Sequence, residues 1–373
     1  MITELEAWTV PYTEPNDHGS TRFVTICRLT DDAGNHGWGE AVTIAPEAAR
    51  ATTIVLRTWA ESILGTPATP AGVGLFAEQR GWWYGTFGGV SGFATAALDT
   101  AVWDLLGRRL GASVVDLLGG ARHESLPTIV TSHAMRADLR QGAEEFAQWA
   151  QRLGAAGVKV GFGKAGDAHL GFEHERDVAF LSEIRRALGE KAQILIDVSP
   201  RVAWSPSDAI RRVLAFEEYG LHWIEEPLGA RDPEGYARLR DATSTLIAYG
   251  EREWTVGGMA EILATGTVDV LGIDPGRAGG ISGFRAGAEL AAAHHRQVNA
   301  HAFAGPISYA GGLAVSLASA NCRQFEVAPL RNTLITELSP ALPLPVDGLV
   351  SPLEGSGLGV EIDVERLLAV AET

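Results

Sequence analysis

The stretch His222-Trp223-Ile224-Glu225-Glu226-Pro227-Leu228 decides the fold, because it begins as a buried strand and ends in two carboxylates and a proline. A short apolar run that stops in this way is typical of a strand inside a domain. A carboxylate is costly in a core unless it is paired, but it is useful in a site. Two flanking runs end in the same way, Ile194-Leu195-Ile196-Asp197 and Leu246-Ile247-Ala248-Tyr249-Gly250-Glu251. Three successive strands that end in a carboxylate therefore indicate a site at one edge of a sheet.

Composition limits the class of protein and its partners. The chain has 373 residues, of which 46% are hydrophobic and 20% are charged. This length is enough for one large domain with a smaller one, or for two ordinary domains. The formal net charge of −16 argues against nucleic acid as a partner, because phosphate binding needs a basic surface. An anionic substrate would therefore need locally placed cations or a metal ion.

The chain has none of the patterns typical of a membrane or secreted protein. It lacks a run of about 18 apolar residues, so we expect no membrane span and no membrane partner. Met1–Glu6 is acidic and lacks the basic-then-apolar order of a signal peptide. Cys27 and Cys322 are far apart, which argues against a disulfide framework and favours a reducing compartment. We therefore expect a cytoplasmic protein.

From about residue 126 onward, β-like runs alternate with helical stretches, roughly 25–35 residues apart, and this alternation favours a (β/α) barrel. A doubly wound open sheet is the alternative. However, Gly161–Gly166 does not match the glycine-rich fingerprint of a dinucleotide-binding loop. The predicted strands are 127–131, 157–160, 193–197, 222–225, 246–250, 268–273, 297–300 and 323–327. The predicted helices are 140–154, 173–188, 207–219, 256–264, 283–293 and 306–319.

The regions before and after this alternation have a different pattern. Residues 22–41 predict a β-meander, and residues 48–64 and 92–110 have the apolar spacing of helices. Residues 12–20 are rich in turn-forming types, so we expect a mobile loop that is a candidate lid. After residue 335 the chain is rich in Pro and Gly, and we expect this part to pack back on the N-terminal region.

In a (β/α) barrel, the active site lies at the carboxyl ends of the strands. Asp197, Glu225 and Glu251 end three successive strands, so their side chains should converge. Three carboxylates repel one another unless they share a cation. An all-oxygen ligand set favours Mg²⁺, or Mn²⁺, over Zn²⁺. The structural alternative is that each acid caps a helix or pairs with a base.

Four further side chains stand at predicted strand ends. Lys159 would neutralise a substrate carboxylate, or pair with one of the acids. Asp274 precedes His301 by one strand, and an aspartate there would fix the histidine tautomer and raise its basicity, as for a general base. Glu326 would face the same mouth and hydrogen-bond an anionic intermediate, or serve a structural role.

The whole set resembles the enolase superfamily, and within it the mandelate racemase-like group. The likeness extends over nearly the whole chain. The intervals between Asp197, Glu225, Glu251, Asp274 and His301 are 28, 26, 23 and 27 positions. The matching motifs are Lys159, Asp197, Trp223-Ile224-Glu225-Glu226-Pro227, Gly250-Glu251-Arg252, Asp274-Pro275-Gly276-Arg277-Ala278-Gly279-Gly280, Ala300-His301 and Phe325-Glu326.

This resemblance implies an α/β fold in three parts. A (β/α)7β TIM-like barrel at 126–330 would carry the catalytic residues. An α+β capping domain at 1–125 would cover it, and the segment 331–373 would return to the cap. The resemblance also implies a small carboxylate substrate and a homo-oligomer.

The implied chemistry is abstraction of the proton α to a carboxylate. Asp197, Glu225 and Glu251 would bind Mg²⁺, which stabilises the enediolate, and His301 with Asp274 would be the general base. Dehydration of a hydroxy (sugar) acid to a 2-keto-3-deoxy acid, a hydro-lyase reaction, is the preferred hypothesis. A racemase or epimerase and a non-catalytic acid-binding homologue are the alternatives.

One departure from the family decides that preference. The family often has Lys-x-Lys where this chain has Lys159-Val160-Gly161, and glycine cannot carry a proton. Two-base racemisation needs a proton-transfer group on each face of the α-carbon, whereas dehydration needs only His301. Lys164 lies three residues beyond Gly161 in a glycine-rich loop and is a secondary candidate for the absent group. Substrate choice should depend on residues 12–22, Trp82–Tyr84, His133, Arg201 and Trp204.

Overall fold

Three antiparallel strands open the chain in the computed structural model, which describes residues 1–85, 88–164 and 166–372. These strands are β1 (Ile2–Glu14), β2 (Ser20–Asp31) and β3 (His36–Ile44), and they pair in the order β1-β2-β3. A single 3-10 turn, η1 (Pro15–Asp17), joins β1 to β2. The prediction of a loop over residues 12–20 is therefore wrong at its start, because Tyr12, Thr13 and Glu14 extend the β1–β2 ladder.

Four helices pack on this sheet and complete the cap, the name used here for β1–β3 and α1–α4. They are α1 (Pro46–Trp59), α2 (Pro70–Gly81), α3 (Gly89–Leu110) and α4 (Val114–Leu117), with a 3-10 turn η2 (Trp82–Tyr84) after α2. Helix α3 lies so close to β3 that a Cβ atom at Gly39 would stand 1.8 Å from the carbonyl oxygen of Ala97. Glycine at this position therefore permits the packing of the helix on the sheet.

Eight parallel strands follow within the described residues, and seven helices connect them. The strands are β4 (Leu126–His133), β5 (Gly157–Phe162), β6 (Gln193–Val198), β7 (Leu221–Glu225), β8 (Leu246–Tyr249), β9 (Val270–Ile273), β10 (Gln297–Ala300) and β11 (Phe325–Val327). The helices are α5 (Leu139–Leu153), α6 (His174–Leu188), α7 (Pro206–Glu217), α8 (Pro233–Ala242), α9 (Val256–Ala264), α10 (Gly280–Ala293) and α11 (Pro306–Ala318). The strand order β10-β9-β8-β7-β6-β5-β4-β11 confirms the predicted (β/α)7β barrel. Helix α8 is absent from the predicted set.

The barrel interior explains why the carboxylates reach the mouth. Leu195, Trp223 and Ala248 belong to an apolar cluster that also contains Ile129 and Val270, contributed by five strands. Side chains two residues apart on a strand share a face. Asp197 and Glu225 therefore follow Leu195 and Trp223 on the inward face, one layer closer to the carboxyl ends of the strands. Asp197 and Glu225 are also direct neighbours in the β6–β7 ladder.

The barrel has a seam between β10 and β11. Strand β10 pairs with β9 and strand β11 pairs with β4, but no ladder joins β10 to β11 in the described chain. One isolated bridge, Val298 to Cys322, closes the gap. The side chain of Asn299 also crosses it and donates to Glu326 Oε1 at 2.6 Å.

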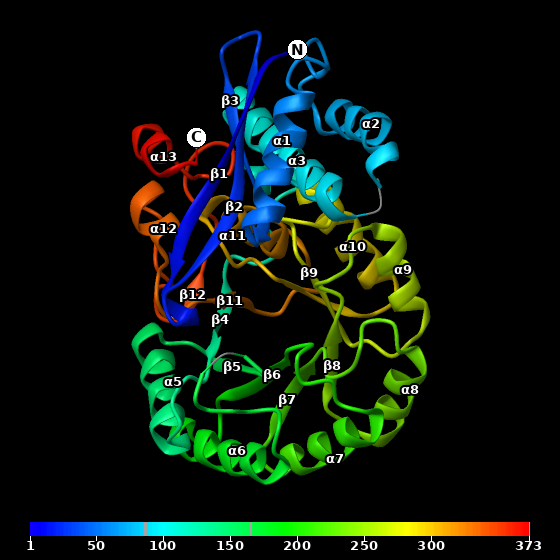
Figure 1. Ribbon diagram of the computed structural model, residues 1–373, viewed down its shortest axis with the longest axis vertical. Helices are drawn as coiled ribbons and strands as arrows, with labels where there is room; N and C mark the ends of the chain where they lie inside the picture. Colours follow the sequence, from blue (N-terminus) through cyan, green and yellow to red (C-terminus); the bar gives the residue numbers. More distant parts are fainter. Residues whose placement is uncertain (86–87, 165, 373) are drawn as a thin grey trace.

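The C-terminal segment returns to the cap. It contains α12 (Thr333–Leu338), a short strand β12 (Leu349–Val350) antiparallel to β4, and α13 (Val364–Val370). The backbone N–H of Glu372 donates to Thr9 O on β1 at 2.9 Å. Figure 1 shows α12 and α13 beside the β1–β2 hairpin, and the two chain ends at the same end of the molecule. The domain limits at 125/126 and 330/331 stay predictions.

Two buried carboxylates of the cap contact the N-termini of barrel helices. Glu40 on β3 accepts hydrogen bonds from the backbone N–H groups of Gly305 at 2.7 Å and Ser308 at 3.3 Å, where α11 begins. Asp99 on α3 accepts one from Ser282 N at 2.8 Å, in the first turn of α10. Burial raises the pKa of each carboxyl to about 7, against the opposing effect of these hydrogen bonds.

None of the helices in the described ranges is long and apolar enough to span a membrane.

Candidate active site at the barrel mouth

A cavity of about 200 Å³ lies between the β1–β2 hairpin and the carboxyl ends of the barrel strands. Five residues predicted from strand ends or nearby loops line it: Lys159, Lys164, Asp197, Glu251 and His301. The other lining residues are Tyr12, Glu14, Asn16, Arg22, Ile44, Thr131, Ser132, His133, Arg277, Phe303 and Ala328. The structure therefore brings most of the predicted site residues to one enclosed space, and Glu225, Asp274 and Glu326 stand behind its wall.

Lys159 holds two of the predicted acids. Its buried ammonium lies 2.7 Å from Glu225 Oε2 and 2.8 Å from Glu326 Oε2. Burial alone would lower the lysine pKa, but the two carboxylates outweigh it and raise the pKa well above the ordinary value. Thr131 and Asn299 also donate to Glu326, at 2.8 and 2.6 Å. Both oxygens of Glu326 are thus engaged, and this residue orients Lys159 in the present arrangement.

The three predicted metal ligands each face a different cation. Lys164 Nζ lies 3.3 Å from Asp197 Oδ2, Lys159 lies beside Glu225, and His301 Nε2 is 3.8 Å from Glu251 Oε2. Among the described side chains, no three His, Cys, Asp or Glu groups have the mutual spacing of a metal site. The residues are adjacent, but their oxygens point at these cations.

The chemistry of the donors nevertheless fits a hard divalent cation. Burial raises the pKa of Glu225 well above its ordinary value, and Glu326, Asp197 and Glu251 raise it further, against the effect of Lys159. Such crowding of like charges is relieved by a shared cation. The set supplies only oxygen atoms, which suits Mg²⁺.

His301 and Asp274 form the predicted pair. His301 Nδ1 lies 3.0 Å from Asp274 Oδ2, and Asp274 Oδ1 accepts a hydrogen bond from Gly276 N at 2.8 Å. Burial lowers the pKa of His301, but Glu251 and Asp274 outweigh it and raise the pKa to about 9. With Nδ1 held by Asp274, Nε2 is the ring nitrogen on the side of Glu251, which lines the cavity.

The family models match both parts of the chain. Residues 6–119 match the N-terminal domain of mandelate racemase and muconate lactonizing enzyme, and residues 141–367 match the enolase C-terminal domain-like family. The chain belongs to the mandelate racemase-like group of the enolase superfamily. Members of this superfamily are enzymes that bind Mg²⁺.

Relatives within the superfamily differ in their named reactions. The chain is 30% identical to a D-galactonate dehydratase of Verminephrobacter eiseniae, over 98% of this chain and 93% of that protein. It is 29% identical to a 3,6-anhydro-alpha-L-galactonate cycloisomerase of Streptomyces coelicolor, over 92% of this chain and 90% of that protein. Its fold matches a racemase from Streptomyces coelicolor with bound magnesium, with a TM-score of 0.85, 23% identity and coverage of 100% of both chains.

The cap supplies residues that the sequence alone does not single out. Arg22 at the start of β2 lines the cavity and pairs with Asp17 at 2.9 Å. It falls within residues 12–22, which we expect to affect substrate choice, but no motif marks it. Among the other candidates for substrate choice, His133 lines the cavity, whereas Trp204 is buried and donates to Gly171 O at 2.7 Å. Arg201 is exposed and not among the lining residues.

The tryptophans of η2, which are also candidates for substrate choice, do not line this cavity. Trp82 and Trp83 are 60% and 78% exposed and are not among the residues that line the cavity. Their rings contact each other at a tilt of 33°, with centroids 4.2 Å apart. Residues 86 and 87, which belong to the same glycine-rich loop, lie outside the described residues.

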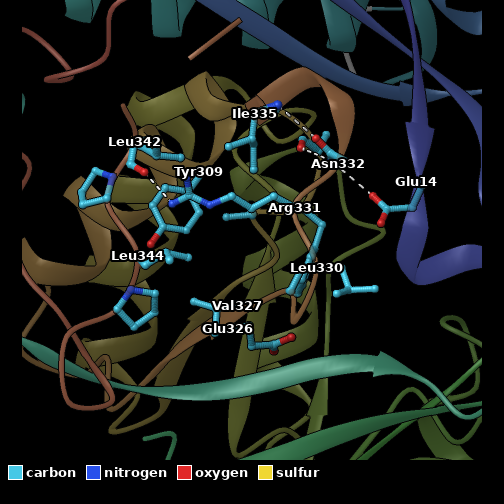
Figure 2. A pocket seen from close by; sticks show the side chains of 17 residues that line it. Glu14, Tyr309, Glu326, Val327, Leu330, Arg331, Asn332, Ile335, Leu342 and Leu344 are labelled. Atoms are coloured by element: carbon cyan, nitrogen blue, oxygen red, sulfur yellow. Dashed lines mark hydrogen bonds between the residues drawn. The ribbon is translucent and has the colours of Figure 1, made fainter. Parts of the chain in front are cut away.

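A second, smaller cavity of about 60 Å³ lies beside the first and shares Glu14, Phe303 and Ala328 with it. Figure 2 shows its largely apolar lining, with Glu326 at one edge and Arg331 extending beside Tyr309 toward Leu342. Asn332 donates to Glu14 Oε2 at 3.2 Å and so ties the C-terminal segment to the hairpin. The shared residues therefore separate the second cavity from the active-site cavity.

Proposed function

We propose that this protein is a Mg²⁺-dependent hydro-lyase that removes water from a hydroxy (sugar) acid and yields a 2-keto-3-deoxy acid. The observation that carries the proposal is that His301, held by Asp274 at 3.0 Å, lines the same cavity as Asp197, Glu251 and Lys159. A proton-accepting imidazole, a carboxylate set and a cation then surround one small substrate. The dehydratases among the relatives support the same reaction class.

The metal would be held by Asp197, Glu225 and Glu251. When bound, Mg²⁺ would supply electrostatic stabilisation of negative charge on the substrate carboxylate. A cation on Glu251 would also offset one cause of the raised pKa of His301.

The residues of the chain would perform the remaining steps. Lys159, held by Glu225 and Glu326, would donate hydrogen bonds to the substrate carboxylate and fix its position. Asp274 would hold Nδ1 of His301, so that Nε2 accepts the α-proton. The electron pair of the C–H bond would form the enediolate, and departure of the 3-hydroxyl group with a proton would release water. The enol product would then tautomerise to the 2-keto acid.

An assay of product formation tests this function. The protein is incubated with Mg²⁺ and a panel of aldonic and aldaric acids, and 2-keto acid is detected with semicarbazide. We expect turnover of at least one acid and a loss of about 10²–10⁴-fold in a His301→Asn variant, since this is the usual contribution of a general base. Robust turnover by that variant would refute the role of His301.

Epimerisation is the second candidate. One observation favours it, which is that Lys164 lines the same cavity as His301. The cycloisomerase among the relatives is compatible with this alternative. Deuterium uptake at the α-carbon in D₂O, without formation of 2-keto acid, would support an isomerase over a hydro-lyase.

A further inference from the structure

Gly161 on β5 lies between two residues that line the cavity. In the parallel ladder it pairs with His133 on β4 and with Asp197 on β6. It stands two residues beyond Lys159 on β5, so both residues are on the inward face of the strand. A side chain at position 161 would therefore point into the barrel mouth, beside Asp197.

The space of that missing side chain is filled by another residue. A Cβ atom built on Gly161 would stand 2.9 Å from Cγ and 3.2 Å from Cε of Lys164. It would also stand 2.5 Å from Nδ1 of His133. The aliphatic part of Lys164 thus lies directly on the Cα atom of Gly161, and its ammonium continues to 3.3 Å from Asp197 Oδ2.

The loop after β5 reverses the direction of the chain and so places Lys164 over Gly161. Gly163 has a φ of +73°, a conformation that other residues rarely adopt, and its N–H donates to Leu170 O at 2.8 Å. A Cβ atom on Gly163 would stand 2.0 Å from Cγ2 of Val202, so glycine is needed for space as well. This reversal brings Lys164 back over Gly161.

Lys164 and His301 line the same cavity from different sides. Lys164 follows β5 and His301 follows β10, and at least three strand positions separate these two strands around the barrel in either direction. Lys164 contacts Asp197, whereas His301 approaches Glu251. A small substrate held by Lys159 would therefore have one nitrogen group on each side.

We infer that Lys164 is a second catalytic residue, which protonates the departing hydroxyl group on the face of the substrate opposite His301. The inference rests on the proposed dehydration. His301 takes the α-proton, and the C–H electron pair enters the enediolate. The bond from C3 to oxygen then breaks with its electron pair on oxygen, and Lys164 donates the proton that completes the water molecule. Solvent later removes the proton from His301 and returns one to Lys164.

Lys164→Ala separates this role from a structural one. The variant is compared with the wild-type protein at saturating Mg²⁺ in D₂O, with the panel of aldonic and aldaric acids. Two rates are measured, α-hydrogen exchange by NMR and 2-keto acid formation. We expect product formation to fall by about 10²–10⁴-fold, while exchange driven by His301 stays within about threefold. Lys191→Ala, at an exposed lysine outside the cavity, is the matched control.

Other outcomes would overturn the inference. It fails if Lys164→Ala leaves both rates unchanged, if both rates fall together, or if only His133→Asn stops product formation. If the wild-type protein exchanges the α-hydrogen but forms no 2-keto acid, the proposed dehydration is wrong. In that case a catalytic role of Lys164 is supported only by one result. Lys164→Ala must stop α-hydrogen exchange in one of two substrate acids that are epimers at C2, and His301→Asn must stop it in the other.

Gly161→Ala gives an independent measurement that needs no substrate. Its methyl group would meet Lys164 Cγ at 2.9 Å as well as His133 Nδ1 at 2.5 Å, so part of its effect on stability should disappear in the Lys164→Ala background and the part due to His133 should remain. Urea unfolding of the four proteins measures this coupling. Equal destabilisation by Gly161→Ala in both backgrounds would show that Lys164 does not occupy the space beside Gly161, and it would remove the basis of the inference.

Discussion

Replacing Glu40 by glutamine should change how the stability of the protein depends on pH. Glu40 is a buried carboxyl of the cap that accepts backbone hydrogen bonds at the start of α11, and burial raises its pKa from 4.5 to about 7. The folded protein therefore binds this proton more tightly than the unfolded chain does. The resulting stabilisation is complete below pH 4.5 and is lost as the pH rises through 7.

The size of the effect follows from the two pKa values. A change from 4.5 to about 7 corresponds to about 3 kcal/mol between the limits of low and high pH. Between about pH 5.5 and 8.5 the wild-type protein should lose about 2 kcal/mol of stability through this group. A glutamine side chain cannot ionise, so the Glu40→Gln variant should lack this part of the pH dependence.

Urea unfolding at fixed protein concentration, at several pH values across the same range, measures the difference between the two proteins. Glu78→Gln, at an exposed carboxylate of α2, is the control and should run parallel to the wild type. Asp99→Asn should behave like Glu40→Gln, because burial also raises the pKa of Asp99 to about 7. Parallel curves for the wild type and Glu40→Gln would refute the reasoning.

Three other predictions concern stability and the metal. Lys159→Met should destabilise the protein by about 3–5 kcal/mol in urea unfolding, because Glu225 and Glu326 lose their shared buried partner. Unchanged stability would mean that both acids are neutral in the wild type. Gly39→Ala should cost at least about 1–3 kcal/mol through its contact with Ala97, whereas Gly74→Ala, in α2 with open space around it, should stabilise by about 0.5–1 kcal/mol. EDTA should abolish turnover, and added Mg²⁺ should restore it; activity that persists in EDTA would contradict the metal assignment.

The strand ends could be predicted because two simple periodicities control them. Alternation along β6 and β7 places Asp197 and Glu225 inward beyond Leu195 and Trp223, and a run of apolar residues shows where each strand lies. Helix α8 was missed because Pro233–Ala242 is short and polar, with only Gly235, Tyr236 and Leu239 buried. A weak apolar stripe of this kind cannot be distinguished from a loop.

Contacts that depend on backbone reversals or on the position of the cap cannot be predicted from the sequence. The return of Lys164 depends on the positive φ of Gly163, and a side chain at that position would also clash with Val202 from a later loop. Arg22 enters the site because the β1–β2 hairpin extends over the mouth, and the register of that hairpin is set by its turn. The spacing of motifs carries no information on either arrangement.

The seam between β10 and β11 has a mechanical consequence for the active site. His301 directly follows β10, and Glu326, which orients Lys159, lies on β11. These two residues therefore sit on opposite edges of one curved sheet, joined in the described chain by the Val298–Cys322 bridge and by side-chain hydrogen bonds from Asn299 to Glu326 and from Asn321 to Arg296 O. Sliding one edge past the other breaks a single isolated bridge, whereas a shift between any two laddered strands of the described barrel breaks a continuous ladder. We therefore expect the distance between His301 and the Glu326–Lys159 pair to change more readily than distances between site residues on laddered strands.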